Sequence, residues 1–210
     1  MFRKDLTKSA RDFIMLVWPT VRQYFNNCKI RQVETVATIP FCKELDREAG
    51  IDAWILDTTK GMRALASRVQ WNINYKTFTI RKERASGMKT EFEKRLYAIK
   101  NDWLYPFYTI HAYISEKNNK KELLSVAWCR TKDLIEYIEE GILGEDYYIK
   151  TVFNNGKADF YVVPWKLFHH IYSLEKWDRT RGYVKYTDTL IKPSSPKTRS
   201  LGFKKLSDFF

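Results

Sequence analysis

Residues 50–71, GIDAWILDTTKGMRALASRVQW, contain two apolar runs on either side of a polar turn. Ile51–Leu56 and Arg63–Trp71 have the composition and length of strands, and the turn between them predicts an antiparallel hairpin. In such a hairpin the numbers of paired residues sum to roughly 118–120. Asp52 is therefore expected to lie across from residues 66–68.

The segments around this hairpin predict one α+β domain over residues 1–177, with a central mixed sheet flanked by helices and additional α/β elements toward the C-terminus. Apolar residues at three- and four-residue steps predict a helix over Leu6–Phe25, kinked at Pro19. A strand at Lys76–Arg81 is expected to follow the hairpin as the third strand of a meander. The other expected elements are a helix capped by Thr90 and Glu93 and ended by Asn101, a buried strand at Tyr105–Ile114, a returning strand at Leu123–Cys129, a helix begun by Thr131 and stopped by Gly141, a hairpin of Tyr147–Phe153 with Ala158–Val163, and a helical turn within Trp165–Ile171.

The composition indicates a basic protein with a polyanionic partner. Lysine and arginine number 37 against 25 acidic residues, which gives a net charge of +12 and a pI near 9.5. Each cation placed on a phosphate releases condensed counterions, so this excess favours nucleic acid. The alternatives are an anionic membrane surface and a basic protein kept soluble by its charge.

The cysteines and apolar runs indicate an intracellular protein without a membrane partner, and a role on DNA would place it at the nucleoid or a site of DNA replication. Cys28, Cys42 and Cys129 are odd in number, far apart and without metal-type spacing, which predicts reduced thiols. No segment has the roughly 20 consecutive apolar residues that span a bilayer. The run Phe13–Trp18 is short and ends at Pro19, as in a core helix.

Asp52 is the candidate centre of a polar site. Alternation along the second strand places Arg68 and Gln70 on one face and Ser67, Val69 and Trp71 on the other. Asp52, Arg68 and Gln70 could therefore converge. A carboxylate in an apolar strand needs a partner or a cation, because desolvating its charge is costly. Pairing of Asp52 with Arg68, with Gln70 bonded to backbone groups, is the structural alternative.

A helix, a hairpin carrying Gly50-Ile51-Asp52, a strand with the polar pair of Arg68-Val69-Gln70, then a helix and a buried strand resemble the PD-(D/E)XK nuclease superfamily. The resemblance covers about residues 6–114 and implies a restriction-endonuclease-like core. It also implies magnesium- or manganese-dependent hydrolysis of DNA, in which Asp52 holds the metal, Gln70 positions water and Arg68 stabilises the phosphorane charge.

The sequence departs from that superfamily where its second acid would stand, because Arg68 occupies the position. Magnesium prefers several hard oxygen ligands, so a second carboxylate is required, and Asp46 and Glu34 are the candidates. If neither reaches the site, the resemblance implies a DNA-binding shell without cleavage.

A basic segment before and within the capped helix is the candidate DNA-binding surface. Cations beside a helix N-terminus can clamp phosphate. The alternative is a solvated loop balanced by the nearby glutamates Glu83, Glu91 and Glu93. The candidate DNA-binding residues are Arg81, Lys82, Arg84, Lys89, Lys94 and Arg95.

The C-terminus predicts a tethered docking peptide. Residues 178–202 lose apolar density and become rich in proline, serine and lysine, which indicates a flexible basic linker. Residues 203–210, FKKLSDFF, resemble the sliding-clamp docking peptide (PIP box), in which Leu206, Phe209 and Phe210 would plug one clamp pocket. Phe203 stands where that family has glutamine. The alternative is that the tail packs on its own domain.

Three hypotheses follow for the function. The first is a DNA nuclease or nuclease-like factor recruited by a replication clamp, from a phage, plasmid or archaeal replication system. The second is a non-catalytic DNA-binding accessory protein on the same fold. The third is a protein-interaction factor whose basicity is incidental. A homodimer is compatible with each of them.

Overall fold

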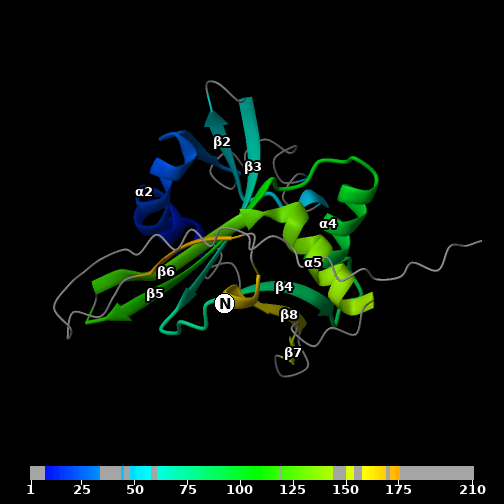
Figure 1. Ribbon diagram of the computed structural model, residues 1–210. Coiled ribbons are helices and arrows are strands. Elements are labelled where there is room, and N and C mark those ends of the chain that lie inside the picture. The colour runs from blue at the N-terminus through cyan, green and yellow to red at the C-terminus, as the bar shows by residue number, and fades with distance from the viewer. Residues whose placement is uncertain are drawn as a thin grey trace, which may run out of the picture.

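The computed structural model describes residues 8–33, 44, 48–57, 61–118, 120–143, 150–153, 158–168 and 171–175. The domain is mixed α+β, with a large mixed sheet, a small second sheet and a few helices (Figure 1). The predicted fold class, a mixed sheet flanked by helices, is therefore confirmed at this level. Asp46, Glu34, Cys42, the turn at 154–157, the linker at 178–202 and the peptide at 203–210 lie outside the described residues.

The N-terminal helix forms as predicted but changes its winding around Pro19. Residues 8–12 are α-helical, η1 (Phe13–Val17) is a π-helical turn, α2 (Trp18–Val21) follows, and η2 (Arg22–Phe25) closes as a 3₁₀ turn. Proline has no N–H and crowds the preceding turn, and the turn directly before Trp18-Pro19 is the wider, π-helical one.

The large sheet has the strand order β1-β2-β3-β5-β6-β9. The hairpin of β2 (Ala53–Asp57) with β3 (Gly61–Trp71) is antiparallel, and Ala53 pairs with Leu65, so the predicted register is confirmed. β5 runs parallel to β3, and the other pairs in this sheet are antiparallel. The remaining strands are β1 (Lys29–Gln32), β5 (Tyr108–Lys117), β6 (Lys120–Arg130) and β9 (Tyr172–Glu175).

We had expected β4 (Thr77–Arg84) to extend the hairpin into a three-stranded meander, and this prediction is wrong. β4 belongs to the second sheet, of order β4-β8-β7, in which β8 (Ala158–Pro164) pairs with β4 on one side and with β7 (Lys150–Phe153) on the other. The third strand of the meander is β1, a short edge strand whose KIRQ sequence has little strand character. Only the tertiary contacts show that β1, and not β4, is the third strand beside the hairpin.

Two helices and the second sheet cover one face of the large sheet, and the N-terminal helix covers the other (Figure 1). α4 (Glu91–Lys100) has the predicted capping box of Thr90 and Glu93. α5 (Thr131–Leu143) continues past Gly141, which does not end it. The turn after β8 is the 3₁₀ turn η5 (Trp165–Leu167).

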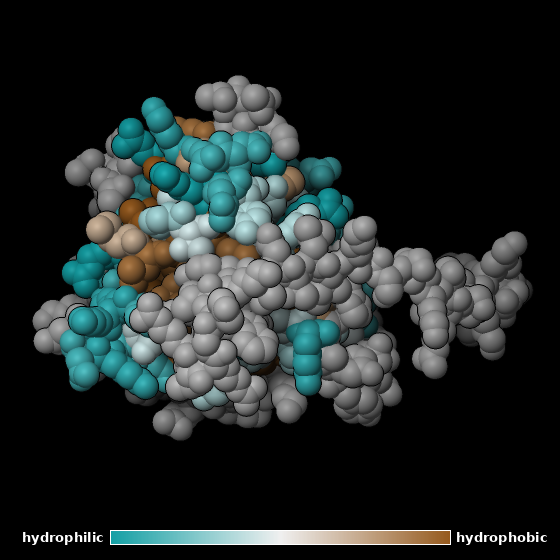
Figure 2. All heavy atoms as spheres, turned by 60° about the vertical axis from the view of Figure 1, so that its left-hand side comes forward, coloured by the Kyte–Doolittle hydropathy of each residue, from teal (hydrophilic) through white to brown (hydrophobic). Residues whose placement is uncertain are grey.

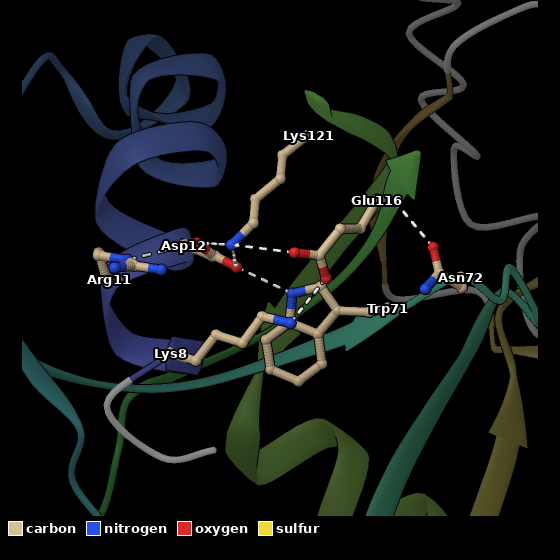
Figure 3. A network of polar contacts seen from close by, with 7 residues as sticks. All are labelled: Lys8, Arg11, Asp12, Trp71, Asn72, Glu116 and Lys121. Carbon is tan, nitrogen blue, oxygen red and sulfur yellow. Dashed lines mark hydrogen bonds and ion pairs between the residues drawn. The ribbon is translucent and has the colours of Figure 1, made fainter. Parts of the chain in front are cut away.

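A polar network joins the N-terminal helix to the far end of the large sheet (Figure 3). Asp12, only 3% exposed, accepts hydrogen bonds from Trp71 Nε1 at 2.9 Å and from Lys121 Nζ at 2.7 and 2.8 Å. Lys8 donates to Glu116 at 2.7 Å and lies over the Trp71 ring. Each carboxylate therefore has cationic partners, as a buried charge requires.

Seen from the side of the N-terminal helix, hydrophobic residues reach the surface in a patch among hydrophilic ones (Figure 2). Met15 on η1 is among the exposed apolar side chains. Among the described residues, no helix is both long and apolar enough to cross a bilayer.

Candidate anion-binding site

Asp52 lies at the start of β2, next to the pair of Ala53 with Leu65. Its Oδ2 accepts the Ser67 N–H at 2.6 Å, and its own N–H donates to Leu65 O at 2.9 Å. The half-buried carboxylate thus accepts a backbone N–H of β3 at the point where the pairing of β2 with β3 ends. This bond gives Asp52 a structural role in strand pairing.

Arg68 and Gln70 share one face of β3, as predicted, because Val69 and Trp71 pack with the core on the opposite face. Arg68 Nη1 donates to the backbone oxygen of Thr79, on β4, at 3.0 Å. Asp52 and Arg68 therefore have different described partners. The contact from Arg68 crosses from the large sheet to the second one.

Arg68 is one of three side chains that dock the free edge of β4. His111 Nδ1 accepts the Thr79 N–H at 3.2 Å, and the Tyr113 hydroxyl contacts both the N–H and the carbonyl of Thr77, at 3.1 and 3.0 Å. Arg68 pairs with His111 across β3 and β5, and Tyr113 follows His111 by two residues on β5, so the three side chains form a row on one face. An edge strand would otherwise leave these backbone groups unpaired, at a cost in stability.

His111 is a neutral member of this row. The side chain is 4% exposed, and burial together with the charge of Arg68 lowers its pKa from 6.5 to about 3. Nδ1 lies 3.2 Å from the Thr79 nitrogen and 3.3 Å from the Thr77 carbonyl oxygen, and the ring tautomer decides which of the two it bonds.

Two guanidinium groups lie over one aromatic ring beside this row. The Cζ atoms of Arg68 and Arg81 are 4.8 and 5.6 Å from the centre of the Phe160 ring, on β8. A bulge follows Arg81 in the pairing of β4 with β8, and Lys82 then lies over the next ring, Tyr161, at 5.6 Å. Bulges often redirect side chains in this way beside functional sites.

Arg95, on α4, brings a third guanidinium to the same place. It is 6% exposed and faces Gly50, where an added Cβ would stand 3.9 Å from Nη2. Gly50 has φ +64°, a backbone conformation that suits glycine, whereas the distance to Arg95 is an ordinary van der Waals contact. Arg95 is therefore not on the surface clamp that we predicted, because its position on α4 faces the interior of the domain.

Arg68, Arg81, Arg95 and Glu91 form what we call the arginine cluster. Burial lowers the pKa of Arg68. The positive charges of Arg81 and Arg95 lower it further, and the negative charge of Glu91 acts in the opposite direction. Burial alone would raise the pKa of Glu91, but the three arginines outweigh it and the pKa is lowered. Glu91 is therefore ionised, and the cluster has three cations for this one anion.

Some donors of the arginine cluster have no acceptor. Within the described part of the chain, the Nε atoms of Arg81 and Arg95 and the hydroxyl of Thr79 are buried without a hydrogen-bond partner. Unpaired buried polar groups are rare and costly in folded proteins. Excess positive charge and unused N–H groups together favour an anionic ligand.

The same residues do not suit a divalent cation. Among the described residues, no group of three or more His, Cys, Asp or Glu side chains could hold a metal ion. Asp52 already accepts a backbone N–H, and Glu91 stands among three guanidinium groups that would repel the ion. Asp46 and Glu34, the predicted additional ligands, lie outside the described residues.

The other predicted DNA-binding residues are divided between two places. Arg81, on β4, belongs to the arginine cluster and Lys82 lies over Tyr161, whereas Lys89 and Lys94 line a separate pocket beside α4. The backbone of Arg84 ends β4, but its side chain is outside the described residues. The basic segment is therefore not one continuous clamp.

Sequence reasoning missed His111, Phe160 and the role of Glu91 at this site. Glu91 was considered only as a residue that balances a solvated loop. The alternation of Thr77, Thr79 and Arg81 in β4 was a usable signal, since it set one strand face apart as polar. Phe160 had no such signal, because it comes from a strand about eighty residues further along the chain.

Comparisons with protein-family models, with curated proteins and with solved structures gave no match for this chain.

Proposed function

We propose that the protein binds nucleic acid, with DNA as the expected form, and that the arginine cluster holds phosphate groups of the backbone. The observation that carries the proposal is the surplus of guanidinium over carboxylate, with two Nε donors buried and unpartnered. Guanidinium matches the geometry of phosphate oxygens and forms strong, charge-assisted hydrogen bonds with them.

The surroundings of the cluster support this proposal. Arg68 and Arg81 are only half-buried, so a phosphate can approach them from solvent. Their stacking on Phe160 restricts both side chains, which reduces the entropy lost on binding. The net charge of +12 would attract a polyanion from a distance and make binding dependent on salt.

Arg81→Gln is the variant that tests the proposal. Arg81 makes no described ion pair, and its Nε is unpartnered, so its loss leaves the docking of β4 by Arg68 intact. We expect about a fivefold to tenfold lower affinity for duplex DNA. The plot of log affinity against log salt should lose about one unit of slope. Fluorescence anisotropy across a salt series measures both quantities.

Arg22→Gln is the matched control, because Arg22 is exposed on η2, over the opposite face of the large sheet. It should leave DNA affinity within about twofold of the parent. Equal losses in the two variants would mean that the chain binds DNA through diffuse charge, without a site. No DNA binding by the parent protein at low salt would overturn the proposal.

Metal-dependent cleavage of DNA is the second candidate function. It is favoured by the order of a helix, the meander β1-β2-β3, then α4 and the parallel strand β5, which suits a restriction-endonuclease-like core. Asp52 directly precedes β2, and it is the residue that the resemblance to that superfamily proposes as the metal-binding acid. Nicking of supercoiled DNA with Mg²⁺ or Mn²⁺ by the parent protein, lost in Asp52→Asn with DNA binding retained, would establish cleavage.

Recruitment by a sliding clamp is proposed from the sequence of residues 203–210. A basic tail carrying Leu206, Phe209 and Phe210 would tether the domain to a clamp on DNA and raise its local concentration there. Deleting residues 203–210 should abolish clamp binding and leave the circular dichroism spectrum unchanged. A tail-deleted protein that still binds the clamp would contradict this part.

A further inference from the structure

An aromatic pocket, with two lysines and two glutamates in its lining, lies beside α4. It has a volume of about 270 Å³, and its lining includes Tyr97, Trp103, Leu104 and Lys89. Ala49 also lines it, and the next residue, Gly50, faces Arg95 of the arginine cluster. The pocket and the cluster are thus neighbours on either side of the same short segment.

The end of α4 presents Trp103 in a defined position. Asp102 has φ +52°, and the Trp103 N–H donates to Ala98 O at 2.8 Å, which is the long-range bond of a Schellman cap. The Trp103 ring meets Tyr97 edge to face, with 5.3 Å between centroids. Such a cap explains the contact with Tyr97.

The cap does not explain why so much aromatic surface faces water. Trp103 remains 63% exposed and Tyr97 47% exposed, with Leu104 also exposed beside them. Lys89 Nζ lies 5.0 Å from the centre of the Tyr97 ring. A rigid, exposed pair of rings with a cation at the rim is the arrangement on which nucleic-acid bases stack.

The charges and size of the pocket indicate what it would hold. Lys89 and Lys94 are offset by Glu44 and Glu48, so the lining is neutral overall and does not select a phosphate. Its volume is below the roughly 300–1,000 Å³ of drug-sized sites, which suits a single planar ring system. Carboxylates accept hydrogen bonds only, so they favour bases that have amino groups.

We propose that this pocket stacks one unpaired base of a single-stranded nucleic acid on the Trp103 ring, with Tyr97 at the edge of that base. The proposal rests on the nucleic-acid binding proposed above and adds a preference for single strands over duplexes. Adenine, cytosine and guanine, which carry exocyclic amino groups, should bind in preference to thymine.

Trp103→Ala tests the pocket, with Tyr75→Ala as the matched control, because Tyr75 is 69% exposed and does not line the pocket. Anisotropy is measured with three ligands of equal length: a single strand, a single strand of abasic units and a duplex. We expect Trp103→Ala to weaken single-strand binding roughly tenfold and duplex binding less than twofold. Tyr75→Ala should match the parent on all three ligands.

The abasic strand separates stacking from charge. The parent should bind it roughly tenfold more weakly than the normal strand, and Trp103→Ala should bind both strands equally. Equal affinity of the parent and of Trp103→Ala for the normal strand would contradict the proposed base pocket. The proposal would also be contradicted if Trp103→Ala reduced only the self-association of the protein, as measured by sedimentation. If mononucleotides compete at micromolar concentration, a free nucleotide and not a strand is the ligand.

Arg81→Gln in the same assay distinguishes the two proposals. Weaker binding of single strand and duplex in that variant, with no effect of Trp103→Ala, would reject the base pocket and leave the phosphate site standing. Parent protein that binds neither ligand would reject both.

Discussion

Trp71 and Arg68 lie three residues apart on β3 and on opposite faces of the large sheet, where each joins a polar cluster. On one face, Asp12 and Glu116 are held by lysines and by the indole N–H (Figure 3). On the other, the three guanidinium groups of the arginine cluster face Glu91, with two Nε donors unpartnered.

The difference teaches how a structural charge cluster can be told from a ligand site. Where each carboxylate has cationic partners, removing either partner leaves a buried charge without compensation, so both are needed for stability. Where cations are in surplus, removing one relieves repulsion, and the stability of the free protein does not require it. An anionic ligand bound at the arginine cluster would neutralise this surplus of positive charge.

The largest effect is expected from Asp12→Ala, which removes the shared acceptor of Trp71 and Lys121. It should lower the free energy of unfolding by about 3–5 kcal/mol, because two half-buried donors lose their shared, buried partner. Urea denaturation measures the change. Glu136→Ala, which breaks an exposed ion pair with Lys132, is the control and should cost less than about 0.5 kcal/mol. If Asp12→Ala lowered the free energy of unfolding by less than about 1 kcal/mol, the cluster around Asp12 would not be a structural charge cluster.

A smaller, pH-dependent effect is expected from His111. Its pKa of about 3 in the folded protein is below the usual 6.5, so the unfolded chain binds the extra proton first as the pH falls. Stability from this residue is present above pH 6.5 and is lost progressively toward pH 3. His111→Gln keeps an acceptor for the Thr79 N–H but does not titrate. At pH 4.5 the parent should have lost about 2–3 kcal/mol more than the variant. Parallel stability curves would contradict the assignment.

Within the arginine cluster, Glu91→Gln should destabilise the free protein. It leaves three guanidinium groups without their anion and removes an acid from the first turn of α4. We expect a loss of about 1–3 kcal/mol at low ionic strength. Phosphate should recover more of this loss than chloride does at equal ionic strength, as thermal unfolding in the two salts would show. Equal recovery by both would argue against a phosphate site.

The smallest change in stability is expected from Arg81→Gln, which should shift the free energy of unfolding by less than about 0.5 kcal/mol in either direction. Its guanidinium adds to the repulsion at Arg68, and its Nε has no hydrogen bond to lose. Urea denaturation of the variant beside Asp12→Ala gives the contrast directly. A loss above 2 kcal/mol would show that Arg81 is a structural residue.

Much of the local structure followed from the sequence. The β2–β3 register came from the turn and the apolar runs, and the start of α4 came from its capping box. These signals act over a few residues, so they can be read without the rest of the chain. Gly141 misled us, because contacts of α5 with the core extend that helix past a residue that usually ends one.

The candidate site was predicted only in part. The shared face of Arg68 and Gln70 followed from alternation, but the partner of Arg68 did not, because β4 belongs to a different sheet from the one that its position in the sequence indicated. Arg95 was placed on the surface since a charged helix residue is usually solvated. The structure instead buries it against Gly50.

The sequence by itself determined the basic character of the protein, the hairpin at residues 50–71 and the polar face of β3, since charge and alternation depend only on the order of residues. Tertiary structure alone decided that β4 would dock on that face and that Phe160 would hold two arginines together. Those contacts join residues far apart in the chain, and their free energy exists only once both sheets are packed.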